Sequence, residues 1–364
     1  MRNWYSLKNT EDLVSPALLV YPDRIEKNIR KMIEMAEGTD FLRPHVKTHK
    51  TAEIIQMQMA HGIHKFKCAT IPEAQLLGKC GAKDILLAMQ PVGANIGRFF
   101  DLITAYPKSE FSTIVDNLKS ISAISEMAEK RDLEAALYLD LNTGMNRTGI
   151  APGETAITLF KTITLHPKLK SKGLHAYDGH LRHTEPATQK TTCDAAFNGV
   201  LKLKEALKSE GFMVENIVAG GSPTFPIHAK RPGVEASPGT TLLWDNGYGT
   251  LFPDMGFVTA AVLFTRIISK PGPSLICLDL GHKAIAPEMP FPRVRIFGLE
   301  HCGQTAQSEE HLVVNCPENN NLEVGDAYYA IPQHICPTVA KYNELLTVED
   351  REITGSWQVA ARDH

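Results

Sequence analysis

The chain of 364 residues has 38 Lys and Arg against 41 Asp and Glu, and 43% of its residues are hydrophobic. This near-neutral, interspersed charge excludes a surface dedicated to nucleic acid or to a membrane, and it favours a small-molecule partner. The N-terminal residues contain no apolar signal region, and no window holds the roughly 18 apolar residues of a membrane span, so we expect a cytoplasmic protein.

Short β-rich runs alternate with longer amphipathic runs from Ser15 to about Gly221. Eight strands are predicted, at residues 17–21, 41–47, 65–69, 85–89, 112–115, 135–141, 172–177 and 216–219. Helices are predicted between them, at residues 24–36, 71–80, 118–130, 153–165 and 192–211. This alternation predicts right-handed parallel crossovers and an α/β fold, a closed (β/α)8 TIM-type barrel over residues 15–249. An open doubly wound sheet is the alternative, but the missing GxGxxG motif after the first strand disfavours it.

The pattern of predicted secondary structure changes after Gly249. Short strand-like runs follow one another, separated by Pro, Gly and Asn, at residues 255–269, 274–279, 294–299, 311–314, 327–331 and 344–348. They show little helical periodicity. We therefore expect a C-terminal antiparallel β domain over residues 250–364, with residues 1–14 folding back onto it.

The seven cysteines do not indicate a disulfide framework, because their number is odd, they are scattered, and no CxxC pair occurs. Six of them are interpreted as small buried or half-buried residues, namely Cys68, Cys80, Cys193, Cys277, Cys302 and Cys316. Cys336 differs from these six because a histidine lies two residues before it.

The most basic stretch is RPHVKTHKT at residues 43–51. If strand alternation continues through it, Arg43, His45, Lys47 and His49 share one face. Cationic neighbours disfavour an ammonium, and an uncharged lysine is the nucleophile that Schiff-base chemistry with a carbonyl or with pyridoxal phosphate requires. The alternative is a basic strand end that reaches into water or binds a phosphate.

The glycine-rich turn after the last predicted barrel strand is a candidate phosphate site. In a barrel the active site lies at the carboxyl ends of the strands, and phosphate commonly binds after strands seven and eight. Gly220 and Gly221 allow backbone N–H groups to approach a phosphate, and Ser222 and Thr224 offer hydroxyl groups. The alternative is a plain turn.

Two further side chains are expected at this end of the barrel. Alternation places His175 and Tyr177 on one side of the seventh predicted strand, where an aromatic ring either lies against a flat cofactor or packs in the barrel core. Arg147 follows the sixth predicted strand on a loop bracketed by glycines, within reach of a ring heteroatom or an acidic group.

The second domain contains a candidate metal-ligand pair, His334 and Cys336. An extended backbone points both side chains the same way, and an imidazole with a thiolate suits a divalent metal such as zinc. Substrate or water has to complete the shell, so the metal is expected to be catalytic. The alternative is an ordinary buried His and Cys. His180 and His183 are a second candidate pair, for which a loop-capping role is the competing interpretation.

Five motifs together resemble one enzyme family. They lie at residues 43–50, 144–149, 218–222, 237–240 and 332–338. In combination they resemble the D-threonine aldolase and D-serine dehydratase family, fold type III pyridoxal phosphate enzymes with an alanine-racemase-like barrel and a C-terminal β domain. The resemblance covers the chain from about Ser15 to Trp357 and is most specific at the lysine and His-x-Cys motifs.

The resemblance implies roles for individual residues. Lys47 is expected to hold pyridoxal phosphate covalently, and Tyr177 to flank its ring. Arg147 is expected to face the pyridine side, where an arginine keeps the ring nitrogen unprotonated and weakens the ring as an electron sink. The phosphate is expected to bind at Gly220, Gly221 and Ser222. His334 and Cys336 are expected to hold a divalent metal, zinc or alternatively manganese or magnesium, that polarises the substrate β-hydroxyl.

The family contains two reactions of D-configured 3-hydroxy amino acids. In retro-aldol cleavage, a base takes the β-hydroxyl proton and glycine and an aldehyde form. In dehydration, a base such as Lys47 removes the α-proton, hydroxide leaves, and a keto acid and ammonia form. Cys336 stands where aldolases tend to carry an aspartate, and Asp178 where they tend to place a basic histidine, for which His180 is a nearby substitute. These departures slightly favour dehydration.

The resemblance also implies a homodimer in which each barrel mouth faces the β domain of the partner. Two other functions use the same barrel and cofactor. A racemase needs a second acid/base group opposite Lys47, typically a tyrosine, and has little use for a metal-ligand pair. A non-catalytic pyridoxal-phosphate-binding protein usually lacks the second domain.

Overall fold

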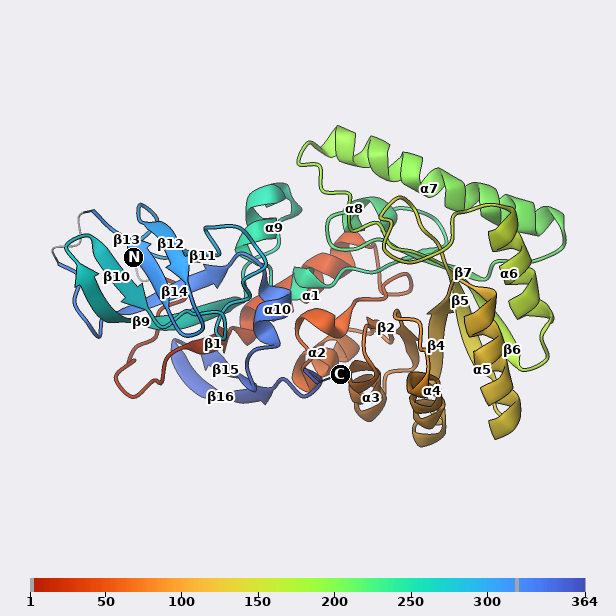
Figure 1. The fold of residues 1–364 in the computed structure, drawn as a ribbon, viewed down its shortest axis with the longest axis horizontal. Helices are drawn as coiled ribbons and strands as arrows, with labels where there is room; N and C mark the ends of the chain where they lie inside the picture. Colours follow the sequence, from red (N-terminus) through yellow and green to blue (C-terminus); the bar gives the residue numbers. More distant parts are fainter. Residues whose placement is uncertain (1–2, 318–320, 364) are drawn as a thin grey trace. The chain divides into compact units, whose positions relative to one another are not determined.

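The computed structural model describes residues 3–317 and 321–363, and these residues form two compact units. The barrel unit consists mainly of Met32–Lys47 and Ile55–Gly239. The sheet unit consists of the chain up to Lys31, Thr48–Ile54 and Thr240–Arg362. The colouring along the sequence in Figure 1 shows that the sheet unit combines the start and the end of the chain.

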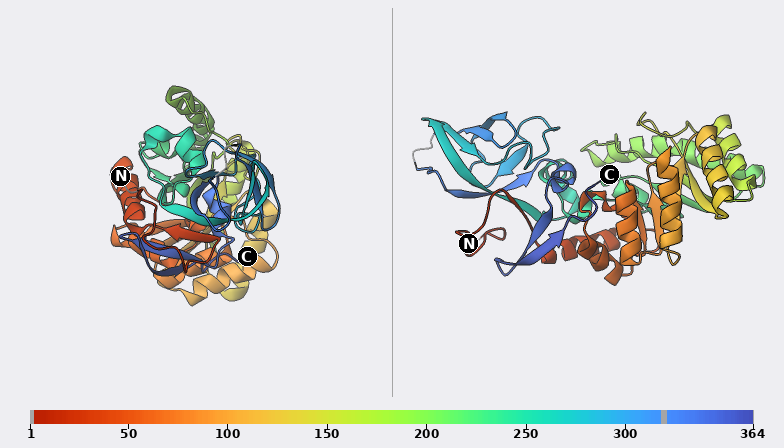
Figure 2. Two further views of the ribbon diagram at one scale, coloured as in Figure 1. Left: turned by 90° about the vertical axis from the view of Figure 1, so that its left-hand side faces the viewer. Right: turned by 60° about the horizontal axis from the view of Figure 1, so that its bottom comes forward.

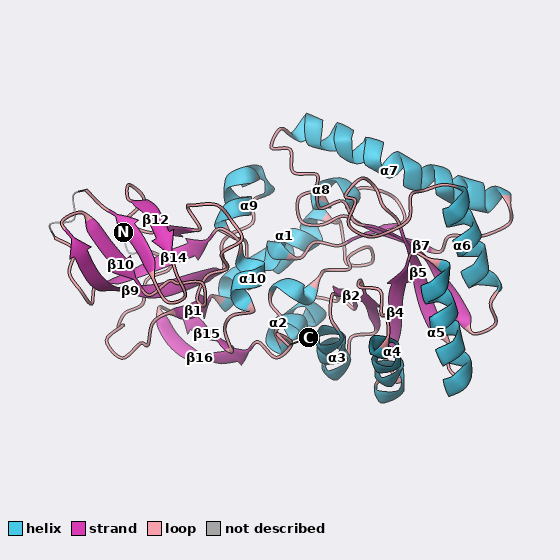
Figure 3. Ribbon diagram, viewed as in Figure 1, coloured by secondary structure: helices cyan, strands magenta, loops and turns pink. Residues whose placement is uncertain are grey.

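A parallel sheet of seven strands forms the centre of the barrel unit. Its strands pair in sequence order: β2 (Lys65–Cys68), β3 (Asp84–Leu87), β4 (Glu110–Val115), β5 (Ala135–Asp140), β6 (Leu169–Ala176), β7 (Asn216–Ala219) and β8 (Val234–Ala236). Amphipathic helices connect these strands and pack against them: α3 (Ile71–Cys80), α4 (Ala94–Ala105), α5 (Leu118–Arg131), α6 (Glu154–Leu165), α7 (Pro186–Ser209) and α8 (Phe225–His228). Figure 3 shows this alternation of strands and helices.

The segment of residues 41–45 closes the sheet. Leu42 forms a parallel bridge with Ala236 of β8, and His45 forms one with Lys67 of β2. Both edges of the seven-stranded sheet are therefore paired, which leaves the barrel without an open edge. The predicted (β/α)8 TIM-type barrel is confirmed, with this short segment in the place of one strand.

The membership of the barrel differs from the prediction at three places. The predicted first strand exists as β1 (Ala17–Val20), but it belongs to the sheet unit, where it pairs with β9 and β15. Its buried ALLV run fits a central strand of either sheet, so the sequence pattern does not discriminate. The strand β8 was missed because three residues are too few to show a pattern. The predicted strand at 41–47 ends in a 3-10 helix, η1 (Val46–Thr48).

Local sequence signals explain where two of the barrel helices begin and where one of them ends. Thr70 caps α3 by accepting a hydrogen bond from Glu73 N, and Gly81 ends this helix in the left-handed conformation. Asn117 caps α5 in the same way, through Ser120 N. These caps place each helix directly after the carboxyl end of a strand, which leaves the strand ends available for a site.

A nine-stranded sheet forms the sheet unit. Its strands are β1, β9 (Ala261–Gly272), β10 (Leu275–Leu278), β11 (Val294–Ile296), β12 (Gly303–Gln307), β13 (Leu312–Asn315), β14 (Ala327–Pro332), β15 (Glu344–Glu349) and β16 (Glu352–Gln358). All its pairs are antiparallel except β1 with β15. The predicted antiparallel β domain is thus confirmed, with one parallel pair that β1 introduces. Figure 2 gives two further views of the strands.

The N-terminal segment packs on this sheet, because Leu7 joins a buried cluster with Leu19, Val262 and Phe264. Short helices complete the unit: η2 (Thr240–Leu242), α9 (Asn246–Leu251), η3 (Pro253–Met255) and α10 (Ile335–Val339). Two helices, α1 (Pro22–Met35) and α2 (Ala52–Ala60), contain residues of both units. Among the described residues, no helix is both long and apolar enough to cross a membrane.

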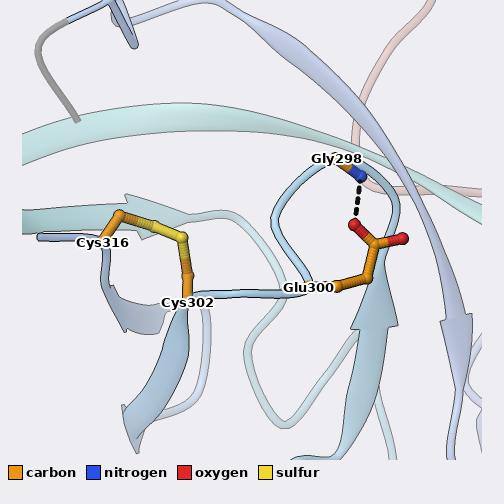
Figure 4. The surroundings of a disulfide bond; sticks show 4 residues. All are labelled: Gly298, Glu300, Cys302 and Cys316. Carbon is orange, nitrogen blue, oxygen red and sulfur yellow. Dashed lines mark hydrogen bonds between the residues drawn. A yellow bond between two sulfur atoms is a disulfide. The ribbon is translucent and has the colours of Figure 1, made fainter. Parts of the chain in front are cut away.

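One disulfide joins Cys302 and Cys316 in the sheet unit (Figure 4). The prediction that these two cysteines are separate buried thiols is wrong. They lie at the open end of the paired strands β12 and β13, where Gly303 pairs with Asn315, so the pairing of neighbouring strands brings them together. The sequence separation of 14 residues carries no pairing signal by itself.

Candidate active site

Lys47 lies in η1, directly after the segment that closes the barrel, and its side chain is half-buried. The predicted alternation of Arg43, His45, Lys47 and His49 along one strand face is wrong, because η1 interrupts the extended backbone after His45. The N–H of Lys47 instead donates to Nδ1 of His45 at 3.3 Å. Lys47 thus leaves the barrel wall on a turn rather than on a strand.

Two of the expected cationic neighbours of Lys47 do not act as free charges: Arg43 is paired with carboxylates, and His49 is uncharged. Arg43 is completely buried, and its guanidinium binds Asp84 through two hydrogen bonds of 2.7 Å and Glu235 through one of 2.6 Å. His49 is also fully buried, and burial lowers its pKa to about 3, so its imidazole is neutral at neutral pH.

The ring of Tyr177, which follows β6, lies close to the cationic groups of Lys47 and of two other described residues, Lys67 and Arg147. Lys47 Nζ lies 5.7 Å from the ring centroid, Lys67 Nζ lies 5.6 Å from it, and Arg147 Cζ lies 4.7 Å from it. Such distances allow cation–π attraction. Lys47, Arg147 and Tyr177, which the sequence predicts as one site, therefore do lie together at the carboxyl ends of the strands. Lys67 joins them and was not predicted.

The glycine turn after β7 approaches this ring from another side. A Cβ atom on Gly221 would lie 3.0 Å from Cε2 of Tyr177, and one on Gly220 would lie 2.6 Å from Cδ2 of His228. Gly220 also has a φ of +77°, which side chains rarely adopt. The backbone at Gly220 therefore requires glycine, a side chain at Gly221 would require Tyr177 to shift, and the turn lies close beside Tyr177.

The hydroxyl groups of this turn have different roles. Thr224 Oγ1 donates to Asp178 at 2.7 Å and accepts from the N–H of Gly221 at 3.3 Å, so it organises the turn itself. The expectation that Thr224 contributes to phosphate binding is therefore not supported by its contacts. Ser222 is buried, and its Oγ accepts from the N–H of Gly239 at 3.2 Å.

A buried polar pair lies on the neighbouring strands β5 and β6. His175 Nδ1 is 2.6 Å from Asp140 Oδ1, and both residues are buried. Burial lowers the pKa of His175, although the hydrogen bond with Asp140 opposes this shift. Among the described residues, His175 Nε2, Asp140 Oδ2 and the Tyr138 hydroxyl have no hydrogen-bond partner. The barrel interior thus contains buried polar atoms that no described protein group satisfies.

A cavity of about 340 Å³ in the barrel unit is lined by Lys47 and Arg147, and also by His45, Asp116 and Asp140. Its size is within the range of small-molecule sites. The residues present fit pyridoxal phosphate: an amine for its carbonyl carbon, cations for its anionic oxygens, an aromatic face, and a tight glycine turn at Gly220 and Gly221.

In the sheet unit, His334 and Cys336 lie together as expected, but for a different reason. His334 is the extended N-cap of α10 and Cys336 lies in the first turn of this helix, so the predicted extended backbone is wrong. Burial alone would lower the pKa of His334, but hydrogen bonds with Cys336 and Glu288 raise it to about 9. The imidazole and the thiol are therefore in direct contact.

The surroundings of this pair fit a metal site. His334 Nδ1 is 2.7 Å from Glu288 Oε1, the arrangement in which a carboxylate orients a ligating histidine. Cys336 Sγ lies 3.1 Å from Thr48 Oγ1 and 3.3 Å from Thr240 Oγ1. Both residues are half-buried, as a catalytic metal site that also binds a substrate or water requires.

A second group of potential metal ligands lies in the barrel unit. Asp178, Cys193 and His228 are buried, and their ligand atoms lie within 4.8 Å of one another. His228 Nε2 is 2.8 Å from Asp178 Oδ2 and 3.4 Å from Cys193 Sγ. Burial and the charge of Asp178 raise the pKa of Cys193 to about 12, so its thiol is protonated without a metal. Hydrogen bonding alone accounts for these contacts.

His180 and His183 are both exposed. A Cβ atom on Gly144 would lie 3.2 Å from His180 Nε2, so His180 lies over the loop that carries Arg147. The N–H of His183 donates to Gln189 Oε1 at 2.9 Å, next to the start of α7. The contacts of His183 agree with the loop-capping interpretation rather than with a metal pair.

Sequence reasoning missed Lys67, Glu288 and His228. Lys67 stands two residues after Lys65 on β2, and strand alternation places these two lysines on one face and Phe66 on the other, which was a signal that the lysines share a side of the strand. Glu288 lies 46 positions before His334, on a loop without periodicity, and nothing in the sequence links the two. His228 lies in α8, a helix of four residues.

Two family models match the chain. The first, described as alanine racemase, N-terminal domain, matches residues 20–246, and the second, described as "Putative serine dehydratase domain", matches residues 260–348. The 3-hydroxy-D-aspartate aldolase of Paracoccus denitrificans is 26% identical over 96% of this chain and 92% of its own length. The D-threonine aldolase of an Arthrobacter species is 27% identical, with the same coverage of both chains.

Solved structures show the same fold. The crystal structure of D-threonine aldolase from Filomicrobium marinum has a TM-score of 0.89 and 24% identity, and the match covers 96% of both chains. A D-threo-3-hydroxyaspartate dehydratase with one cysteine replaced by alanine, in its metal-free form, has a TM-score of 0.85 and 20% identity, over 97% of this chain and 98% of that one. The chain therefore belongs to the alanine racemase N-terminal domain family, and within it to the enzymes similar to D-threonine aldolase and D-serine dehydratase.

Proposed function

We propose that the protein is a pyridoxal phosphate- and divalent-metal-dependent lyase that removes water from D-configured 3-hydroxy amino acids. The observation that carries this proposal is the group formed by Lys47, Arg147 and Tyr177 at the carboxyl ends of the barrel strands. It combines a nucleophilic amine, a fixed cation and an aromatic face in one place. The aldolases and the dehydratase to which the chain is similar support the same substrate class.

Pyridoxal phosphate, when bound, supplies a ring that withdraws electrons from the substrate Cα. Lys47 is the residue that we propose to bind it covalently, and its amine is the base that takes the α-proton once the substrate has replaced it. Tyr177 supports the ring face, and Arg147 binds the ring edge. Gly220, Gly221 and Ser222 are proposed to hold the phosphate.

A divalent metal, when bound, supplies a Lewis acid for the β-hydroxyl group. We propose His334 and Cys336 as its protein ligands, with zinc as the metal because it accepts an imidazole and a thiolate together. Glu288 orients His334. Two dehydratase structures support this assignment: one lacks a cysteine and is metal-free, and the other lacks a histidine two positions earlier in that chain.

Dehydration is favoured over aldol cleavage by Cys336 and Asp178. Cys336 supplies the ligand type that is replaced in the metal-free dehydratase. Burial alone would raise the pKa of Asp178, but hydrogen bonds from His228 and Thr224 lower it. The carboxylate after Tyr177 is therefore held in the turn as a permanent anion, which makes it a poor base for a β-hydroxyl group.

Aldol cleavage is the second candidate. The two relatives that cover 96% of this chain at 26% and 27% identity are both named aldolases. His180 is the exposed imidazole beside the Arg147 loop that would take the proton of the β-hydroxyl group.

The test offers D-threonine and D-serine to the protein with pyridoxal phosphate and added zinc or manganese, and it assays glycine, acetaldehyde, keto acid and ammonia together. Keto acid and ammonia are the expected products. Glycine and acetaldehyde without ammonia would establish the aldolase instead. Deuterium exchange at Cα with inversion would establish a racemase, and a cofactor spectrum without any product would establish a non-catalytic binding protein.

We also propose a homodimer, on the resemblance to the family alone. Sedimentation of the active protein at working concentration tests it. A monomer that retains full activity would contradict this proposal.

A further inference from the structure

Lys67 is a buried lysine that the proposed reaction does not use. It lies near the carboxyl end of β2, which pairs with the segment that leads into Lys47. Lys67 is only 2% exposed to solvent. Among the described residues, its ammonium has no hydrogen-bond or ion-pair partner, and its nitrogen lies 5.6 Å from the centroid of the Tyr177 ring.

The charges that face Lys67 come from several elements. Burial lowers its pKa most, the charge of Lys47 lowers it further, and the carboxylates of Asp178 and Asp140 raise it, with a result of about 7. The charge of Arg43, which also faces Lys67, lowers the pKa of Lys67 by a smaller amount than the charge of Lys47 does.

The other groups nearby do not neutralise Lys67. His175 on β6 is uncharged at neutral pH, because burial lowers its pKa and because Lys67 and Arg147 both oppose its protonation. The ring of Tyr177 offers only its face. A buried ammonium without a partner is unfavourable, and an anion that enters beside it removes this cost.

We propose that Lys67 is an anion-binding residue of the cofactor site, whose ammonium pairs with an anionic oxygen of bound pyridoxal phosphate and which takes up a proton when the cofactor binds. The inference rests on the proposed function, because it assumes that this cofactor binds beside Tyr177. Lys47 and Lys67 lie at nearly equal distances from the same ring, at 5.7 and 5.6 Å. In this proposal the two lysines have different roles: Lys47 forms the covalent link with the cofactor, and Lys67 supplies a positive charge.

This proton uptake makes the affinity for the cofactor depend on pH in one direction. If free Lys67 is partly neutral and bound Lys67 is an ammonium, binding takes up a proton, and the affinity falls as the pH rises above about 7. The fall approaches about tenfold per pH unit until the bound form itself loses the proton. Arginine at this position stays charged at all these pH values and removes this fall.

The experiment measures the affinity of the full-length protein for pyridoxine 5′-phosphate, which has the ring oxygen and phosphate but no aldehyde, so Lys47 forms no covalent bond with it. Wild type, Lys67→Met and Lys67→Arg are compared between about pH 6.5 and about pH 9.5. The titration of the compound itself is common to all three proteins. Lys65→Met is the matched control, because Lys65 lies on the same strand but pairs with Glu235.

We expect Lys67→Met to bind about 10- to 100-fold more weakly near pH 7, as for the loss of a charged hydrogen bond. Lys67→Arg is expected to bind with a flatter pH dependence than wild type, and Lys65→Met to bind like wild type. If Lys67→Met binds pyridoxine 5′-phosphate as tightly as wild type at every pH, this inference is overturned and the proposed function stays intact. Failure of wild type to bind either pyridoxine phosphate or pyridoxal phosphate would overturn both.

Discussion

Arg43 binds Asp84 through two parallel hydrogen bonds of 2.7 Å inside the barrel. Glu235 adds a third contact at 2.6 Å, so one buried guanidinium joins the closing segment to β3 and β8. We expect Arg43→Met to lower the free energy of unfolding by about 3–5 kcal/mol, because it leaves Asp84 without its guanidinium partner and leaves the buried Glu235 with Lys65 alone. Urea unfolding near pH 7 measures this change.

The matched control for Arg43 is Arg131→Met. Arg131 also lies 2.6 Å from a carboxylate, that of Asp101, but the side chains are 33% and 64% exposed. Exposed pairs contribute about 0–1 kcal/mol, so this substitution is expected to change the free energy of unfolding little. Equal effects of the two substitutions would show that burial does not determine the strength of these contacts.

Lys67 also makes the stability of the cofactor-free protein depend on pH. Its folded pKa of about 7 lies below the ordinary 10.5, so the unfolded chain binds more protons between these two values. The free energy of unfolding due to this residue therefore rises with pH across this window and is lowest below pH 7. We expect Lys67→Met to stabilise the cofactor-free protein near about pH 6 and to lose this advantage towards about pH 10. A difference between the two proteins that is constant with pH would contradict this account.

Gly220 is predicted to be irreplaceable in the turn beside Tyr177. A Cβ atom there meets the buried ring of His228 at 2.6 Å, whereas one on Gly81, with nearly the same φ, meets nothing within 4 Å. Both alanine variants carry the left-handed strain of about 1–2 kcal/mol. Gly220→Ala is expected to lose about 1–3 kcal/mol more, from overpacking, and to bind pyridoxal phosphate weakly. Unfolding and cofactor titration measure the two effects; cofactor binding by Gly220→Ala at wild-type strength would refute the assigned role of the turn.

The alternation of strands and helices was sufficient to predict the barrel from the sequence, because the helices α3, α5 and α7 carry side-chain caps and apolar faces. It was not sufficient to decide which strands belong to it. The ALLV run of β1 is buried in the sheet unit, and a continuous apolar run is equally compatible with a strand of the barrel and a strand of the nine-stranded sheet. The three residues of β8 are too few to show a pattern, and they form a strand through their pairing with β7 and the bridge from Ala236 to Leu42.

The candidate site was predictable where a motif fixes it and unpredictable where only packing does. Lys47, Arg147 and Tyr177 follow different strands, and the rule that strand ends meet places them together. The role of Arg43 was predicted wrongly, because its partner Glu235 lies on the unrecognised strand β8. Glu288 belongs to a loop, where no periodicity indicates which residue it will face.

Metal analysis separates the two candidate ligand groups. We expect Cys336→Ser to purify with much less zinc than wild type and to lose turnover, because it removes a thiolate ligand of the half-buried pair with His334. Cys193→Ser is the matched control in the cluster with Asp178 and His228, and it is expected to keep the metal content of wild type. Loss of metal from Cys193→Ser, with retention in Cys336→Ser, would move the metal site to the barrel unit.

The covalent attachment of the cofactor tests the central claim most directly. The protein is incubated with pyridoxal phosphate, reduced with borohydride, digested and mapped by mass spectrometry. Two lysines lie within 6 Å of the centroid of the Tyr177 ring, and the account predicts that the reduced cofactor is found on Lys47 and not on Lys67. A label on Lys67, on any other lysine, or on none would contradict it.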